Sequence, residues 1–533
     1  MLIDARDLAE QTVLRTDVCI VGGGAAGITI ARDLQGRGLD VVLLESGGLE
    51  ADPDTQDLAA GAMIDAVFRD GFDPEREIRL QDTRLRYLGG TTNHWAGFCR
   101  PLRPVDYERR SGLVRSGWPF GPDELDPWYR RAHEVIRLGP YEYDWRFWQD
   151  RDGFPRPVLD GPDVSPVLFQ IKFPFSFGEV HRADLEQAED VRLVLHATAT
   201  GLRLDPGGTR VERVDVTALD GPGFVVEPRV VVTAVGGIDS ARLLLASDDV
   251  RPAGVGNGND LVGRFFCDHL MVPSGFAVAN RPLDGYAGLR YDGAGPDGSE
   301  TVGVRSAAVL ADETVRREGR LGLELQLVPF PPTPGATVQD EGVASDAATR
   351  LLEAVGGDEV ASVAYLQAST EMSLDPDNRV TLQRGRLDAT GVPRVSVAWR
   401  PRERDIDAIV SGLAIMAAAM GATGSMRAQL VPDRIRVARP ADPDGPLFRT
   451  LPRDGPLDLS AGASVSFHHM CSTRMATSPR EGVVDADLRV HDTANLFVAG
   501  SASFATPGTS VPTLTIVALA LRLADLIVRE LSS

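Results

Sequence analysis

The sequence predicts an α/β protein of two or more domains. Two observations predict this fold class. Within the first 45 residues, a β-branched strand, a glycine-rich turn, a helical pattern and a second short strand follow one another, which is the order of a βαβ unit with parallel strands. The chain has 533 residues, and this length exceeds what one hydrophobic core usually serves.

The N-terminal unit carries a dinucleotide-binding fingerprint. Residues 17–21 (DVCIV) predict a buried parallel strand, and residues 22–27 then read G-x-G-x-x-G. A helical pattern runs over residues 25–35, and the second strand, residues 40–44, delivers Glu45 at its carboxyl end. With the strand, the turn, the helix and the acid all in register, the sequence predicts a Rossmann-like unit.

Each residue of the fingerprint has its own expected role. Gly22 allows the tight turn, Gly24 lets a pyrophosphate approach the backbone, and Gly27 lets the helix pack closely on the strand. The N-terminus of the helix, with Ala25 and Ala26, offers unpaired N–H groups to the phosphates. We expect the carboxylate of Glu45 to accept hydrogen bonds from the ribose hydroxyl groups. This unit alone does not distinguish NAD from FAD.

The composition is that of an ordinary globular protein, with 43% hydrophobic and 25% charged residues. The net charge of −21 makes nucleic acid and anionic membranes unsuitable partners, because both bind basic surfaces. The four cysteines, at positions 19, 99, 267 and 471, form no C-x-x-C pair. We therefore expect neither a disulfide framework nor a metal site.

The N-terminus and the apolar segments predict a cytoplasmic location. The short, mixed-charge stretch before residue 17 leaves no room for a signal peptide. The apolar run at residues 513–521 is stopped by Arg522 and Asp525, so it is too short to span a bilayer. We expect no membrane span, and the oligomeric state stays open.

Seven further blocks occur in a characteristic order along the chain. They are LGGTTNHW at residues 88–95, WPFGPDELDPWY at 118–129, VVVTAVGGIDSARLLLAS at 230–247, GRFFCDH at 263–269, DPDNRVTL at 375–382, FHHMCSTRM at 467–475 and the segment 495–526. Together they resemble the glucose–methanol–choline (GMC) flavoprotein oxidoreductases. The branch with gluconate and fructose dehydrogenase flavoprotein subunits is the most similar, and pyranose oxidase is more distant.

The resemblance implies FAD as cofactor and a discontinuous layout. A Rossmann-like FAD-binding domain would be assembled from residues 1–135, 190–270 and 456–533, with the catalytic motif in the last segment. A substrate domain built on an antiparallel sheet with helices would take residues 136–189 and 271–455. This makes the expected fold α+β overall.

The resemblance also implies the catalytic residues. His468 matches the active-site histidine of the family, and an imidazole near its ordinary pKa suits the removal of a hydroxyl proton at neutral pH. His469 is its neighbour, and we expect only one of the two to face the flavin. His269, beside Asp268, matches a family position near the domain boundary, and we expect it to be structural.

The second catalytic position of the family is usually His or Asn, and here it is Val511. A valine side chain can neither donate nor accept a hydrogen bond. Three interpretations stay open: His468 acts alone, a neighbour (Thr509, Ser510 or His469) supplies the missing hydrogen bond, or the site performs other chemistry. Pro512 still begins a helix whose N-terminus would point towards the flavin.

The remaining flavin contacts follow from the same resemblance. His94, in the pattern G-G-x-x-x-H, matches a histidine that carries a covalent bond to the flavin in some relatives. The alternative is a histidine that only lines the dimethylbenzene edge of the ring. In either case the expected FAD contacts also include Gly90, Thr91, Asn93, Gly500, Ser501, Pro512 and Thr513.

The expected activity is the oxidation of a CH–OH group of a sugar, glycoside, cyclitol or other secondary-metabolite alcohol, with His468 as base and N5 of the flavin as hydride acceptor. The alternative, suggested by Val511, is redirected chemistry on the same fold, such as isomerisation, elimination or C–C cleavage. An NAD-dependent dehydrogenase would share the N-terminal fingerprint but would not explain the C-terminal blocks. Oxygen, a quinone and a partner protein all stay open as the electron acceptor.

Overall fold

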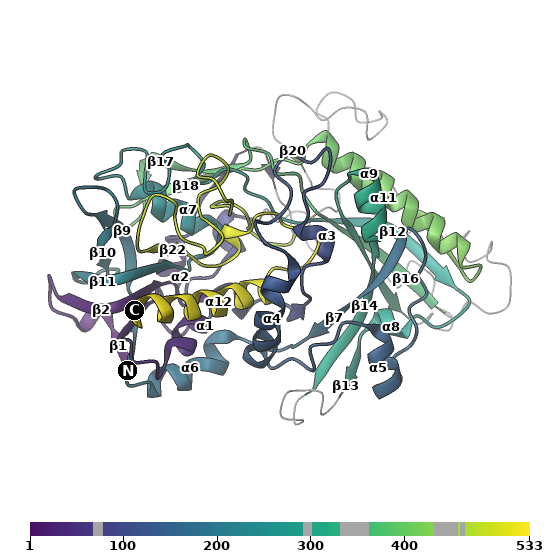
Figure 1. Cartoon of the computed structure of the whole chain (residues 1–533), viewed down its shortest axis with the longest axis horizontal. Coiled ribbons are helices and arrows are strands. Elements are labelled where there is room, and N and C mark those ends of the chain that lie inside the picture. Colours follow the sequence, from purple (N-terminus) through teal and green to yellow (C-terminus); the bar gives the residue numbers. More distant parts are fainter. Residues whose placement is uncertain are drawn as a thin grey trace.

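Two large sheets form the frame of the computed structural model, which describes residues 1–64, 66–67, 78–291, 301–330, 362–430, 457–458 and 464–532. In Figure 1 the first sheet, with β2, β9, β10 and β11, lies to the left, and the second, with β7, β12, β14 and β16, lies to the right. The C-terminal helix α12 runs along the first sheet towards the space between the two.

The first sheet has eight strands in the order β1-β8-β3-β2-β11-β10-β9, with β22 paired to β11. The pairs from β1 to β11 and the pair β11–β22 are parallel, whereas β9 and β10 are antiparallel. The strands are β1 (Leu2–Asp4), β2 (Val13–Val21), β3 (Val41–Leu44), β8 (Val191–Leu195), β9 (Thr198–Leu204), β10 (Val211–Thr217), β11 (Gly223–Thr233) and β22 (Leu496–Val498).

Helices cover this sheet as expected of a doubly wound fold. Helix α1 (Ala25–Leu34) packs against α12 (Thr513–Ser532) and α6 (Phe177–Gln187), and α12 in turn contacts α4 (Pro122–Ile136). Helix α7 (Gly236–Ala246) packs against β9. It also packs against β17 (Arg379–Leu387) and β18 (Pro393–Ala398), two strands of a smaller third sheet. In α12 the buried residues Leu514, Val517, Leu521 and Ala524 recur at helical spacing and hold it in the core.

The second sheet has nine strands, and its main order is β19-β12-β16-β15-β14-β7-β6. Each of its strand pairs is antiparallel. The strands are β6 (Phe98–Cys99), β7 (Val164–Ile171), β12 (Leu270–Ala279), β13 (Leu289–Tyr291), β14 (Val302–Leu310), β15 (Leu323–Phe330), β16 (Ser362–Thr370), β19 (Met426–Leu430) and β21 (Ser464–Val465). The predicted fold class, parallel α/β joined to an antiparallel sheet, is confirmed.

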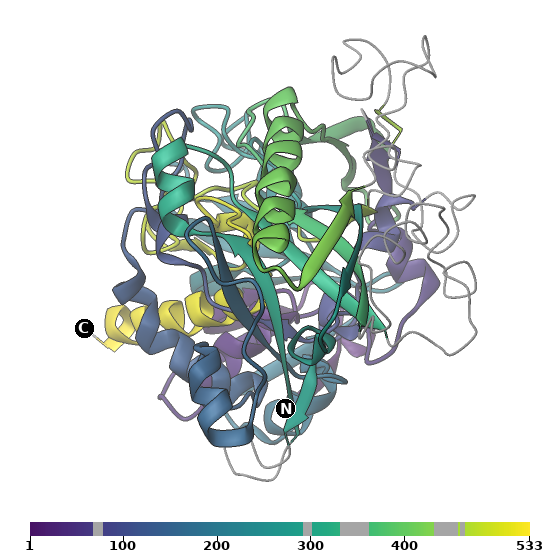
Figure 2. The same cartoon turned by 90° about the vertical axis from the view of Figure 1, so that its right-hand side faces the viewer.

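Helix α11 (Glu403–Ala422) lies across the strands of the second sheet, as Figure 2 shows in green. It is long and apolar enough to span a membrane by length and composition alone, a feature that the sequence analysis missed. Ile406, Ile409, Leu413, Met416 and Met420 are buried in the protein core. This burial is typical of a core helix, which passes the same length and hydropathy test, so the membrane signal is weak.

A smaller sheet joins three distant segments near the first sheet. Its strands are β17 (Arg379–Leu387), β18 (Pro393–Ala398) and β4 (Gly61–Met63), and β5 (Ala66–Val67) pairs with β20 (Leu457–Asp458). The remaining short helices are α2 (Pro53–Asp57), α3 (Pro104–Tyr107), α5 (Trp145–Asp152), α8 (Asp284–Ala287) and α9 (Asp312–Glu318), with 3₁₀ turns η1 (Ala5–Asp7), η2 (Leu80–Thr83), η3 (Gly90–Asn93) and η5 (Ser501–Ser503).

The strands do not follow the predicted domain segments at every point. Strands β6 and β21 lie in segments predicted for the FAD-binding domain, yet they pair with β7 and β12 of the second sheet. The domain boundaries therefore stay a prediction.

We predict that Gly27→Ala destabilises the βαβ unit. A Cβ atom at Gly27 would lie 1.9 Å from the carbonyl oxygen of Gly22, so either the helix or the turn must move, at a cost of about 1–3 kcal/mol. The measurement is the thermal unfolding midpoint together with the FAD content of the purified protein.

The matched control is Gly421→Ala, because Gly421 also lies in a helix but a Cβ there meets nothing within 4 Å. That change should leave the midpoint unchanged or raise it. Equal midpoints for both variants would contradict the proposed close packing.

Candidate functional site

A cavity of about 530 Å³ extends from the N-terminus of α1 to the motif around His468. Its walls come from the turn before α1, from η3 and the residues after it, from the β17–β18 turn, and from residues 466–469, 499–501 and 511–513. The cavity therefore joins the first sheet, the small third sheet and the C-terminal motif. Its size is that of a cofactor or ligand site.

The glycine turn forms one end of the cavity. Gly22 has a φ of +107°, and a Cβ there would lie 2.6 Å from the oxygen of Ala234, so only glycine fits. Gly24 caps α1 without a side chain, and a Cβ there would meet no protein atom within 4 Å. Because Gly24, Ala25 and Ala26 line the cavity, the unpaired N–H groups of α1 are available to an anion.

Glu45 lies at the carboxyl end of β3 and lines the same end of the cavity. Its Oε2 accepts from the backbone N–H of Gly23 at 2.8 Å, and its Oε1 accepts from that of Gly47 at 3.0 Å. These bonds fix the carboxylate. Oε1 also accepts from the hydroxyl of Ser46 at 3.1 Å, whereas Oε2 keeps a further lone pair, which suits a ribose hydroxyl donor.

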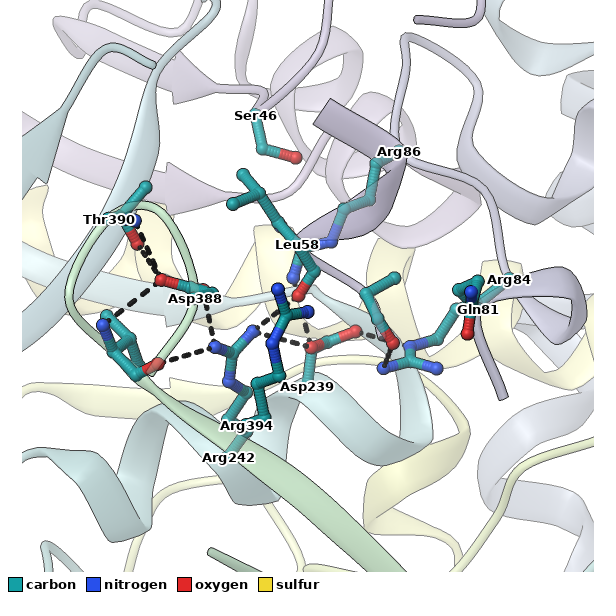
Figure 3. A network of polar contacts seen from close by, with 12 residues as sticks. Ser46, Leu58, Gln81, Arg84, Arg86, Asp239, Arg242, Asp388, Thr390 and Arg394 are labelled. Atoms are coloured by element: carbon teal, nitrogen blue, oxygen red, sulfur yellow. Dashed lines mark hydrogen bonds and ion pairs between the residues drawn. The ribbon is translucent and has the colours of Figure 1, made fainter. Parts of the chain in front are cut away.

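A buried charge network borders the nucleotide end (Figure 3). Asp239 Oδ2 lies 2.7 Å from Nε of Arg84, and Asp239 Oδ1 lies 3.0 Å from Nη2 of Arg86. Arg242 contacts Asp239 at 3.8 Å and Asp388 at 2.5 Å. Burial alone would raise the pKa of Asp239, but Arg84, Arg86 and Arg242 outweigh that effect and hold the pKa below its ordinary value.

The network holds three guanidinium groups against two carboxylates, so it carries one excess positive charge. Arg86 lines the cavity, and its Nε is buried without a hydrogen-bond partner in the described part of the chain. Together with the open N-terminus of α1, this excess charge fits the pyrophosphate of a dinucleotide. The residues present therefore fit FAD, and Glu45, the glycine turn and Arg86 would hold its nucleotide half.

The turn η3 forms the wall near the middle of the cavity. Gly90, Thr91 and His94 line it, and burial lowers the pKa of His94. Asn93 lies outside the lining: its Nδ2 donates to Leu88 at 3.0 Å, and its Oδ1 accepts from the hydroxyl of Ser176. The predicted role of Asn93 in binding FAD stays a prediction, and its visible role is to stabilise the turn.

Two histidines meet at the other end of the cavity. Nε2 of His269 lies 3.0 Å from the carbonyl oxygen of Gly508, which can only accept, so Nε2 carries the proton. Burial lowers the pKa of His269 to about 4, so its ring is neutral at pH 7 and Nδ1 has a lone pair. Nδ1 of His269 lies 2.9 Å from Nδ1 of His468; His468 is thus the donor there.

This contact fixes the tautomer of His468. With the proton on Nδ1, Nε2 of His468 keeps a lone pair, and His468 lines the cavity. Burial, with smaller contributions from His269 and His469, holds the pKa of His468 well below its ordinary value. The imidazole is therefore neutral at pH 7 and able to accept a proton at Nε2. No sequence pattern predicts this role of His269, because the two residues are 199 positions apart in the chain.

The backbone around His468 is held by a buried acid. Oδ1 of Asp268 accepts from the backbone N–H of His468 at 2.9 Å, and burial raises the pKa of Asp268 to about 7. His469 also lines the cavity, and burial lowers its pKa to about 3. Both neighbouring histidines therefore line the cavity, and the expectation that only one of them faces the flavin stays a prediction.

The last wall comes from the segment before α12 and from the second sheet. Gly500, Ser501, Val511, Pro512 and Thr513, the site residues expected from the C-terminal motif, all line the cavity, and their roles there stay predictions. Three residues of the second sheet, Phe98 on β6, Met271 on β12 and Gln326 on β15, line it as well, and no sequence motif pointed to any of them. The described residues contain no group of three His, Cys, Asp or Glu side chains that could hold a metal ion.

Two family models match the chain. The model described as "FAD dependent oxidoreductase" matches residues 17–254, which carry the glycine turn, Glu45 and His94. The model described as "GMC oxidoreductase" matches residues 375–520, which carry both histidines of the motif and Val511. The two matches meet in the cavity described above.

Similar proteins match over nearly the whole chain. The fructose dehydrogenase large subunit of Gluconobacter japonicus is 26% identical, covering 98% of this chain and 99% of its own. Paromamine 6'-oxidase of Streptomyces fradiae is 27% identical, covering 97% and 92%. Among solved structures, pyridoxine 4-oxidase from Mesorbium loti has a TM-score of 0.55 at 18% identity, covering 96% and 98%; this likeness confirms the fold.

We predict that Asp239→Asn destabilises the protein by about 3–5 kcal/mol, because it leaves three buried guanidinium groups with one carboxylate. The measurement is the urea midpoint, with FAD content as a second readout. The control is Asp4→Asn, which breaks an ion pair between partly exposed side chains and should cost less than about 1 kcal/mol. A midpoint for Asp239→Asn as high as that of the control would contradict the role of the network.

Proposed function

Because this chain belongs to the GMC family of FAD-dependent oxidoreductases, we propose that it oxidises a CH–OH group of a sugar, glycoside, cyclitol or other secondary-metabolite alcohol with His468 as the base. Bound FAD supplies the acceptor for the hydride that leaves the carbon. The observation that carries the proposal is the His269–His468 hydrogen bond of 2.9 Å, because it leaves Nε2 of His468 as a proton acceptor at the cavity.

Four features of the protein's own chain would serve this reaction. His468 takes the hydroxyl proton on Nε2, and His269 keeps the ring in the required tautomer and orientation. Asp268 fixes the backbone at His468. The N-terminus of α12, at Thr513, lies at the cavity wall, where its positive end favours the negative charge that develops as the substrate is oxidised.

The substrate class is supported by the relatives. Two proteins that match this chain along nearly its full length are named for fructose and for paromamine, and both compounds carry several hydroxyl groups. We therefore place a polyhydroxylated alcohol first among candidate substrates. The electron acceptor (oxygen, a quinone or a partner protein) and the cytoplasmic location remain proposals.

Val511 supports a second candidate function. If the site lacks the second hydrogen-bonding group that alcohol oxidation uses in this family, the same fold could carry redirected chemistry, such as isomerisation, elimination or C–C cleavage. Binding of an alcohol that shifts the flavin spectrum without bleaching it would favour this second function.

We predict that His468→Ala slows the anaerobic bleaching of the flavin by a substrate alcohol about 10²–10⁴-fold, which is the usual contribution of a general base. The test compounds are fructose and paromamine, and the flavin absorbance is recorded by stopped flow after each is mixed with the protein. Because the pKa of His468 is depressed, the base form persists as the pH falls: the rate should stay level through pH 6.5 and decline only at lower pH.

His491→Ala is the control, since His491 bonds the carbonyl of Ala476 and does not line the cavity. It should keep the wild-type rate. A wild-type rate in His468→Ala, or a decline that begins above pH 7, would contradict His468 as the base.

We also predict that His94→Ala purifies with less flavin, because the ring of His94 lines the cavity beside η3. Acid precipitation of the wild-type protein then separates the two roles left open for this residue. Flavin that stays in the pellet, and is lost from the pellet of His94→Ala, indicates a covalent bond; flavin released from the wild-type protein excludes it. A full and equally tight flavin load in His94→Ala would contradict any contact.

A further inference from the structure

We propose that Gln326 accepts a hydrogen bond from a second hydroxyl group of the substrate, a contact separate from the one that Val511 cannot make. The inference rests on the proposed function and names the side chain that selects a polyhydroxylated substrate. Gln326 belongs to none of the motifs in the sequence.

Gln326 reaches the cavity from the antiparallel sheet. It lies on β15, it is partly exposed, and it lines the cavity together with Met271 of β12. In the sheet, Glu324 and Met271 are both aligned with Ser369 of β16, and Gln326 is two residues further along β15 than Glu324. Residues two apart on a strand share a face, so Glu324, Gln326 and Met271 all lie on the face that borders the cavity.

The orientation of the Gln326 amide follows from its neighbour. Nε2 of Gln326 lies 3.1 Å from Oε1 of Glu324, and Oε2 of Glu324 accepts from Nη2 of Arg100 at 2.7 Å. A carboxylate in an ion pair can only accept, so the amide must turn its NH₂ group towards Glu324. The carbonyl oxygen of Gln326 is then the atom left to accept a hydrogen bond from a ligand in the cavity.

The Arg100–Glu324 pair is a rigid support. The side chains of Arg100 and Glu324 are 3% and 2% exposed, and the guanidinium of Arg100 lies over the ring of Phe169 at 5.2 Å. A buried, paired carboxylate has little freedom to move. It therefore holds the amide of Gln326 in one orientation before a substrate arrives, which lowers the entropy cost of binding.

The same pair connects Gln326 to the segment that carries Val511. Nη2 of Arg100 lies 3.5 Å from Oγ1 of Thr509, and a Cβ on Gly322, immediately before β15, would lie 2.7 Å from the methyl group of Thr509. Thr509 is two residues before Val511 in the chain. Gln326 is thus anchored to the wall in which the second hydrogen-bonding residue is missing.

His468 and Gln326 would then act on two different hydroxyl groups of the substrate. His468 takes the proton of the hydroxyl group that is oxidised, and Gln326 accepts a hydrogen bond from another hydroxyl group of the same molecule. An alcohol with a single hydroxyl group would leave the carbonyl of Gln326 without a partner, and such a loss weakens binding. We expect the site to prefer diols and sugars over simple alcohols.

The test compares Gln326→Leu with Gln367→Leu. Gln367 lies directly opposite Gln326 on β16, on the same face of the sheet, but it does not line the cavity. We measure the anaerobic reduction of the flavin by fructose and paromamine, to separate KM from kcat. The dissociation constant of each compound comes from flavin difference spectra in the His468→Ala background.

We expect Gln326→Leu to raise KM and the dissociation constant about 10–100-fold, with a smaller effect on kcat, and Gln367→Leu to change neither. Gln326→Asn, which keeps the amide but shortens the side chain, should also bind weakly; it replaces Gln326→Leu if that variant does not fold.

Unchanged constants in Gln326→Leu, or equal losses in Gln326→Leu and Gln367→Leu, would overturn the inference while the wild-type enzyme still oxidises the alcohol. If neither compound bleaches the flavin of the wild-type protein, the alcohol-oxidation proposal for these substrates fails first, and the inference fails with it.

Discussion

The carboxylate of Asp239 holds together segments that the chain keeps far apart. Arg84 and Arg86 come from the stretch before η3, Asp239 and Arg242 from α7, and Asp388 from the turn between β17 and β18. These groups are buried, so each charge needs its partner, and losing one carboxylate would leave cations in a medium of low dielectric. The position of the nucleotide end of the cavity therefore depends on this network, and so does its excess positive charge.

At the far end of the cavity a weaker interaction decides the chemistry. A single hydrogen bond between two neutral imidazoles sets which nitrogen of His468 carries the proton. The carbonyl of Gly508 accepts from Nε2 of His269, and Nδ1 of His269 accepts from Nδ1 of His468. The loop that contains Gly508 continues through Val511 to the start of α12. The position of this loop thus determines the tautomer of His468 and also places Val511, Pro512 and Thr513 at the cavity. Burial keeps the histidines neutral, so the base is ready at physiological pH.

Val511 and Gln326 border the same cavity from different parts of the fold. The loop before α12 offers no polar side chain at position 511, and the antiparallel sheet presents an amide at the same cavity. The amide is held by a buried ion pair that also contacts the loop. A hydrogen bond from the sheet would decide which alcohols fit, while the base and the flavin site stay the same.

The sequence alone predicted those parts of the fold and of the site whose residues lie close together in the chain. The fingerprint at residues 22–27 with Glu45 predicted the parallel unit and its helix, because turn geometry and strand patterning depend on near neighbours. The C-terminal motif predicted FAD and singled out His468 and Val511. The length and apolar character of α11 were also present in the sequence, but they were missed. Only the tertiary structure brought His269 to His468, Asp388 to Arg242, and Gln326 to the cavity. The two pairs join residues 199 and 146 positions apart, and no local pattern of burial or spacing records which distant segments will meet.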